Sequence, residues 1–162
     1  MSDLQLLLEE FYRDKLTELL RHQAGARLVW QYDINNTYQY IINREETQLS
    51  WLATAIIELG GTQPADGSEP DRSAGGRGKG DSQAVIEEDS RAAQAFAEKW
   101  RPRVDAMTNA RHRGMLRVIL GETLEQKRFF DQALAGDTDL LGRRTSDVGP
   151  RVGSVLPTRW IE

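Results

Sequence analysis

The chain contains no cysteine among its 162 residues. Disulfides, thiolate metal sites, iron–sulfur clusters and cysteine nucleophiles are therefore excluded. Histidine is scarce as well, since His22 and His112 are the two imidazoles of the sequence. A hydrolytic triad would depend on one of these two, and we do not expect one. The sequence also lacks a P-loop, a dinucleotide-binding fingerprint and a serine elbow.

Positive charge and long apolar runs are also missing. The net charge is −4 and the pI is about 5.3, which argues against general affinity for nucleic acid or anionic membranes. No apolar run approaches the length of a membrane span, and no basic segment precedes an apolar core at the N-terminus. We therefore expect a soluble cytoplasmic protein, with neither membrane nor nucleic acid as a partner.

Apolar residues recur with a helical period in four stretches, and none shows the alternation of a strand. A capping box of Ser2 and Gln5 begins the first helix, and Gly60 follows the second. Pro102 predicts a kink or an early end of the third helix near Arg101. The expected helices cover residues 2 to about 33, about 37 to 59, 81 or 82 to about 101, and 108 to 134.

Residues 62–80 are rich in proline and glycine and lack apolar periodicity, which predicts a flexible crossover. The fold expected is all-α: a four-helix bundle over residues 1–136, built from two antiparallel hairpins joined by this long crossover. We expect the first and third helices to begin at the same end of the bundle. Residues 137–162 are expected to form an irregular C-terminal tail.

A glutamate interrupts the apolar stripe of two of these helices. Glu45 lies within the stripe of the second helix, and Glu122 within that of the fourth. A carboxylate removed from water is costly unless it is paired, protonated or bound to a cation. The two positions therefore predict a shared polar site inside the bundle.

Hairpin geometry indicates which side chains could meet there. Turns centred near residues 35 and 108 would place His22 level with Gln48 and Glu45, and Gln94 level with Glu122. The predicted site consists of His22, Glu45, Gln48, Gln94, Glu122 and Glu125, with Gln126 as an alternative to Glu125. The other interpretation places both glutamates at the stripe edges, paired with Arg44, Arg117 or Lys127, and makes His22 an ordinary buried histidine.

The helix order and two segments, EETQLSWLATAIIELGG and MLRVILGETLEQKRFFDQAL, resemble the ferritin-like superfamily, including its rubrerythrin and bacterioferritin branches. The resemblance covers roughly residues 3–135. It implies a dimetal site with one glutamate from each of two helices and a Glu-x-x-His pair from each of the other two. The cofactor implied is iron or manganese, reacting with oxygen or peroxide.

Matched to that pattern, several positions of this chain carry other residues. In the pair that begins with Glu45, Gln48 occupies the position of the histidine. In the pair that begins with Glu122, Glu125 occupies it. His22 and Gln94 stand where the other two helices would each supply a glutamate. Two functions remain open: a degenerate, non-enzymatic or weakly metal-binding bundle that serves interaction or assembly, and an active di-iron or manganese redox protein. The sequence does not decide whether the protein is an enzyme.

The end of the tail is apolar, with Val155, Leu156, Trp160 and Ile161 in its last eight residues. We expect a homodimer in which the tail packs on the second subunit. A docking peptide that loads the protein into a larger protein shell is the alternative.

Overall fold

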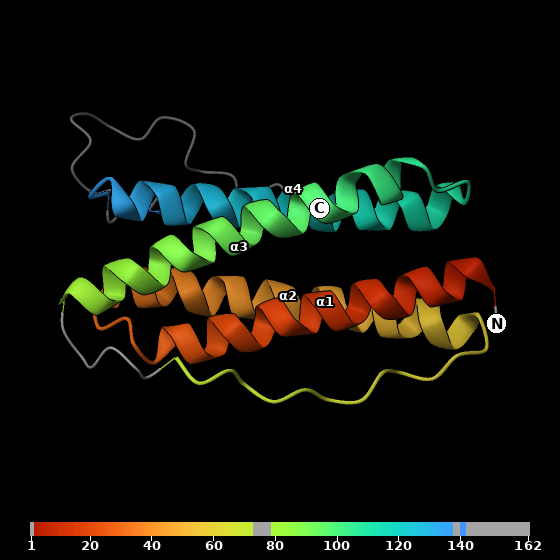
Figure 1. Cartoon of the computed structure of the whole chain (residues 1–162), viewed down its shortest axis with the longest axis horizontal. Helices are drawn as coiled ribbons and strands as arrows, with labels where there is room; N and C mark the ends of the chain where they lie inside the picture. Colours follow the sequence, from red (N-terminus) through yellow and green to blue (C-terminus); the bar gives the residue numbers. More distant parts are fainter. Residues whose placement is uncertain (1, 73–78, 138–139, 142–162) are drawn as a thin grey trace, which may run out of the picture.

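The computed structural model describes residues 2–72, 79–137 and 140–141. Its helices are α1 (Asp3–Ala26), α2 (Tyr32–Glu58), α3 (Lys79–Asp105) and α4 (Ala110–Leu134), and the described residues contain no strand. The four helices lie side by side as a bundle (Figure 1). The predicted all-α four-helix fold is confirmed.

The helices pair as two hairpins, α1 with α2 and α3 with α4, and the hairpins contact each other mainly through α1 and α3. Between α1 and α3, Asp14 pairs with Lys99 at 2.6 Å and Glu10 with Arg103 at 2.8 Å. The expectation that the first and third helices begin at the same end of the bundle is wrong. A crossover that returns along the bundle brings the chain back to the end where α2 begins, so α1 and α3 start at opposite ends (Figure 1).

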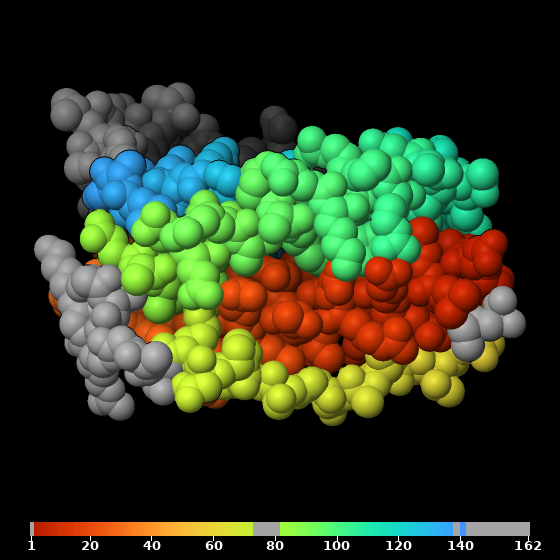
Figure 2. Space-filling view, in the orientation of Figure 1, coloured from red at the N-terminus to blue at the C-terminus, as the bar shows by residue number. Residues whose placement is uncertain are grey.

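The crossover follows the outside of α1 as far as it is described, to Arg72 (Figure 2). Gln63 donates a hydrogen bond to the Tyr12 hydroxyl at 3.0 Å, and Glu69 pairs with Arg27. The predicted crossover therefore exists, and side chains along its described part are bonded to α1 and to Arg27, the residue that follows it.

The predicted boundary between the first two helices is wrong by about seven residues. α1 ends at Ala26 and α2 already begins at Tyr32. Asn35, expected in the turn, lies in α2 and donates from its side-chain amide to the carbonyls of Ala26 at 2.7 Å and Val29 at 3.2 Å. It thereby satisfies the carbonyl of Ala26, which the end of α1 leaves unbonded, and one carbonyl of the turn.

Most other helix ends follow their expected signals. The Ser2 hydroxyl accepts from the Gln5 backbone N–H at 3.1 Å, and the Asn109 side chain caps α4 in the same way. Gly60 and Gly136 follow α2 and α4 with φ of +86° and +93°, which only glycine adopts without strain.

The third helix departs from its predicted bounds at both ends. It begins at Lys79, ahead of the expected Asp81 or Ser82, and continues past Pro102 to Asp105. The early end predicted near Arg101 is therefore wrong. Because Pro102 lies in the last turn, its missing N–H removes one helical hydrogen bond close to an end that would fray anyway.

The core runs the length of the bundle and takes apolar side chains from all four helices. Its largest fully buried members are Trp100, Tyr38 and Phe11. Phe11 of α1 packs edge-on against Trp100 of α3, with ring centroids 4.8 Å apart. Among the described residues, no helix combines the length and apolarity needed to cross a bilayer.

Candidate functional site

A line of polar side chains enters the core from one face of α1. Lys15, Glu18 and His22 follow one another at intervals of three and four residues, which places them on the same side of the helix. Lys15 has no exposed side-chain surface, and His22 is 1% exposed. Lys15 and His22 are therefore removed from water and depend on partners inside the protein.

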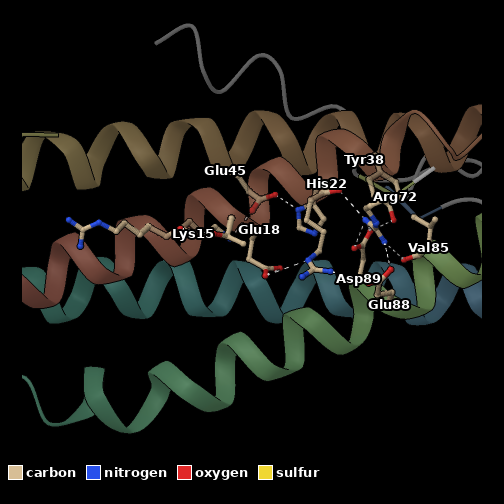
Figure 3. A network of polar contacts seen from close by, with 12 residues as sticks. Lys15, Glu18, His22, Tyr38, Glu45, Arg72, Val85, Glu88 and Asp89 are labelled. Carbon is tan, nitrogen blue, oxygen red and sulfur yellow. Dashed lines mark hydrogen bonds and ion pairs between the residues drawn. The ribbon is translucent and has the colours of Figure 1, made fainter. Parts of the chain in front are cut away.

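Glu45 of α2 is the first of those partners (Figure 3). Its Oε2 lies 3.0 Å from the Lys15 ammonium, and its Oε1 accepts a hydrogen bond from His22 Nδ1. Lys15 also lies 3.4 Å from the hydroxyl oxygen of Thr123 on α4 and 5.3 Å from the centre of the Phe96 ring. A fully buried carboxylate is thus held between an ammonium and an imidazole.

Asp89 of α3 forms a second centre nearby (Figure 3). It accepts hydrogen bonds from the Tyr38 hydroxyl at 2.5 Å and from the Arg72 guanidinium at 2.8 Å. Arg72 comes from the crossover and also donates to the carbonyls of Arg21 at 3.0 Å and Val85 at 3.2 Å. This arginine therefore links α1, α3 and the crossover at one buried carboxylate.

The charges of the network depend on one another. Burial alone would raise the pKa of Glu45, but His22 and Lys15 hold that pKa below its ordinary value. Burial alone would lower the pKa of His22, but Glu45 raises it above its ordinary value. Burial raises the pKa of Glu18 and of Asp89 despite their cationic neighbours. Glu45 is thus a fully buried carboxylate whose neighbours, His22 and Lys15, outweigh the effect of burial on its pKa.

Glu122 of α4 belongs to a more exposed branch. Its two carboxylate oxygens accept from Arg44 and Gln48 of α2, and its side chain is 24% exposed. The pairing with Arg44 is the one that the edge-of-stripe interpretation predicts for Glu122. Glu45, in contrast, lies fully inside the bundle.

Four of the six predicted site residues form two separate contacts, His22 with Glu45 and Gln48 with Glu122. The other two lie elsewhere. Gln94 bonds to Glu98 at 2.6 Å on the outer side of α3, and Glu125 faces solvent near Arg128. The residue of α3 that joins the network is Asp89, about a turn and a half earlier than Gln94. The position of the turn predicts the height of a residue along α3, but it does not predict which face of α3 is buried. Gln126, the alternative to Glu125, is buried.

Four charged residues of the network, Lys15, Glu18, Arg72 and Asp89, are not among the predicted site residues. Lys15 lies in the α1 stripe between Phe11 and Leu19, and Asp89 lies in the α3 stripe between Val85 and Ala93. The criterion that singled out Glu45, a polar residue within an apolar stripe, would have found both. Arg72 had no such signal, since it lies in a stretch without periodicity.

A dimetal centre requires several imidazole or carboxylate ligands directed at a common point. Among the described residues, no three histidine, aspartate or glutamate side chains lie close enough together to hold a metal. Both oxygens of Glu45 face Lys15 and His22, and both oxygens of Glu122 face donors from α2. These side chains do not fit the dimetal centre that the ferritin-like resemblance implies.

Some buried acceptors near the network do remain open. Among the described groups, His22 Nε2, the amide oxygens of Gln48 and Gln126, and one carboxylate oxygen each of Glu18 and Glu45 have no hydrogen-bond partner. The Glu45 oxygen lies 3.0 Å from the Lys15 ammonium as an ion pair, and an amide oxygen is a weak ligand for iron. Because no three histidine, aspartate or glutamate side chains of the described residues converge, these atoms do not restore the missing ligand set.

Comparison of the chain with family models, with curated protein sequences and with solved structures found no match.

Proposed function

We propose that this protein is a non-enzymatic bundle with ferritin-like helix order, in which the Lys15 ammonium takes the place of the metal ion. Its role is then one of binding or assembly. The observation that carries this proposal is the contact of Lys15 with Glu45, 3.0 Å apart and without exposed surface on either side chain.

A buried glutamate needs a nearby positive charge, and in a dimetal site the metal supplies it. Here the ammonium and the imidazole lie against the two oxygens of Glu45. A divalent ion beside Glu45 would meet the repulsion of Lys15 at short range and in a medium of low dielectric constant. Metal binding would therefore require Lys15 to move or to lose its proton.

A role in binding or assembly is supported by the surface. Trp30 and Tyr32, in and beside the turn between α1 and α2, are 62% and 79% exposed, and Val118 on α4 is 51% exposed. Apolar side chains on a surface often belong to contacts with other molecules, although single ones are common. The homodimer predicted from the sequence remains part of this proposal. The tail expected to strap it, residues 137–162, lies almost entirely outside the described residues.

Elemental analysis tests the proposal. Wild-type protein and a Glu45→Gln variant would be produced with iron, manganese and zinc supplied, then freed of loosely bound ions. We expect substoichiometric metal in both, without a difference between them. Glu125→Gln is the matched control, because Glu125 is exposed and lies outside the network.

Near-stoichiometric metal in the wild type and in Glu125→Gln, lost in Glu45→Gln, would overturn the proposal. That result would favour the alternative, a di-iron or manganese redox protein.

A further inference from the structure

A pocket of about 290 Å³ lies between the last turns of α2 and the first turns of α4. Its walls include the apolar side chains of Trp51, Ala55 and Met115, together with His112. Glu58 and Arg111, paired at 3.3 Å, also line it and are largely exposed. The pocket shares no residue with the buried network, so the inference drawn from it stands independently of the proposed function.

His112 makes this pocket chemically unusual. The residue is 7% exposed, and neither of its ring nitrogens has a hydrogen-bond partner among the described groups. Its backbone N–H is bonded to Asn109, but that contact leaves the ring free. An unpaired polar group in a protein interior costs on the order of 1–3 kcal/mol, so such groups usually have a partner. The other histidine, His22, has one in Glu45.

The charge state of His112 limits the chemistry of that partner. Burial, aided by the positive charge of Arg111, lowers the pKa of His112 below its ordinary value. At neutral pH the ring is therefore uncharged, with one N–H donor and one nitrogen acceptor. Arg111 is already paired with Glu58, so the wall presents no unbalanced charge to a ligand.

We infer that this pocket binds an uncharged aromatic compound of one or two rings that carries a single N–H or O–H group, as phenols and indoles do. The size agrees, since an apolar cavity of about 150 Å³ holds benzene in another protein and this pocket is about twice as large. Trp51 and Met115 favour contact with an aromatic ring. The polar group of the ligand would pair with the His112 imidazole, and the rest of the molecule would cover the apolar walls.

Indole and phenol are the probes for the test, which follows the ¹H–¹⁵N spectrum of the full chain and uses calorimetry for affinity. We expect saturable binding by the wild type, with shifts at the Trp51 indole N–H. His112→Phe keeps a ring but removes both nitrogens, and should weaken binding of indole about tenfold, the effect of one hydrogen bond of about 1.4 kcal/mol.

Met115→Trp should abolish binding by filling the pocket, and Ala55→Leu serves the same purpose if that variant fails to fold. Val118→Ala is the control, because Val118 is exposed on α4 and does not line the pocket. The inference is overturned if neither probe binds saturably to the wild type, or if the filling variants bind as well as the wild type. It is equally overturned if toluene binds as tightly as indole and His112→Phe has no effect, because His112 would then be hydrated rather than paired with a ligand.

Discussion

Lys15 lies at the centre of the bundle, with Glu45, Thr123 and the Phe96 ring around its ammonium. Lysine is rarely buried without a partner, because its charge loses the hydration that water supplies. The contacts of Lys15 come from α2, α3 and α4, so its ammonium contacts each of the other three helices. Together with His22, which bonds the other oxygen of Glu45, this side chain explains how Glu45 can be buried.

The pH dependence of stability tests the pairing of His22 with Glu45. The folded pKa of His22 is raised, so its contribution to stability is present below the unfolded pKa of about 6.5 and is lost as pH rises through the folded value. The groups around the ring are Lys15 and Glu18 of α1, Glu45 of α2 and Asp89 of α3. Their coupling broadens the transition.

We therefore predict that the stability difference between wild type and His22→Gln decreases from pH 6 to pH 9, by at most about 1.4 kcal/mol per pH unit. Urea unfolding of both proteins across this range measures it. His112 has a lowered pKa and the opposite dependence, but it is present in both proteins and cancels in the difference. A difference that is constant with pH would show that His22 is not a charged partner of Glu45.

Residue patterns revealed part of this site. A polar residue inside an apolar stripe identified Glu45, and the same rule applied to α1 and α3 gives Lys15 and Asp89. What the pattern could not provide is which polar groups pair, since that depends on the rotation of each helix about its axis. Gln94 illustrates this, because it is near the expected height but lies on the outer side of α3.

At the element scale, Gly25 shows how α1 accommodates the network. It lies near the end of the helix, where a Cβ would be 2.7 Å from Arg72 Nη1 and 3.2 Å from Asp89 Oδ2. Glycine in a helix costs about 1 kcal/mol relative to alanine. Here it allows the guanidinium and the carboxylate to approach the α1 backbone.

We predict that Gly25→Ala lowers the free energy of unfolding by about 1–3 kcal/mol, because the methyl group would displace Arg72 and leave Asp89 without its cation. Gly114→Ala and Gly121→Ala are matched controls in α4, since a Cβ there would meet nothing within 4 Å. Each control should gain about 0.5–1 kcal/mol from helix propensity. Thermal and urea unfolding measure all three. Stabilisation by Gly25→Ala equal to that of the controls would contradict the role given to Gly25.

Apolar periodicity predicted the four helices, but the position of some helix ends depends on contacts between residues far apart in the sequence. The glycines at positions 60 and 136 mark the ends of α2 and α4 because a positive φ is a local property. The end of α1 was missed because Asn35 reaches back from α2 to bond its last turn. Such a bond has no signal in the composition of the turn.

At the scale of the whole molecule, the crossover takes part in the core. Composition predicts a flexible connection for residues 62–80, yet Arg72 bonds to a carbonyl of α1, to a carbonyl of α3 and to Asp89. The two hairpins are therefore joined both by helix packing and by a buried side chain of the segment that links them. No periodic pattern could have predicted that contact.

The buried charges also balance across the molecule. Lys15, Arg72 and His22 face the carboxylates Glu18, Glu45 and Asp89, and the six come from α1, α2, α3 and the crossover. A network of this kind favours one arrangement of the helices over others, because a shifted helix would leave a charge unpaired. The central claim is that this balance is achieved by the protein alone, with Lys15 as the cation beside Glu45.

The most direct test is a double-mutant cycle of Lys15→Met and Glu45→Gln, measured by urea unfolding in the presence of EDTA. We predict a coupling free energy of about 1–3 kcal/mol that does not change when iron or manganese replaces EDTA. The exposed pair Lys127–Asp131, 2.5 Å apart within α4, is the control and should couple by no more than about 0.5 kcal/mol. A cycle without coupling, together with a wild type that only metal stabilises, would contradict the account.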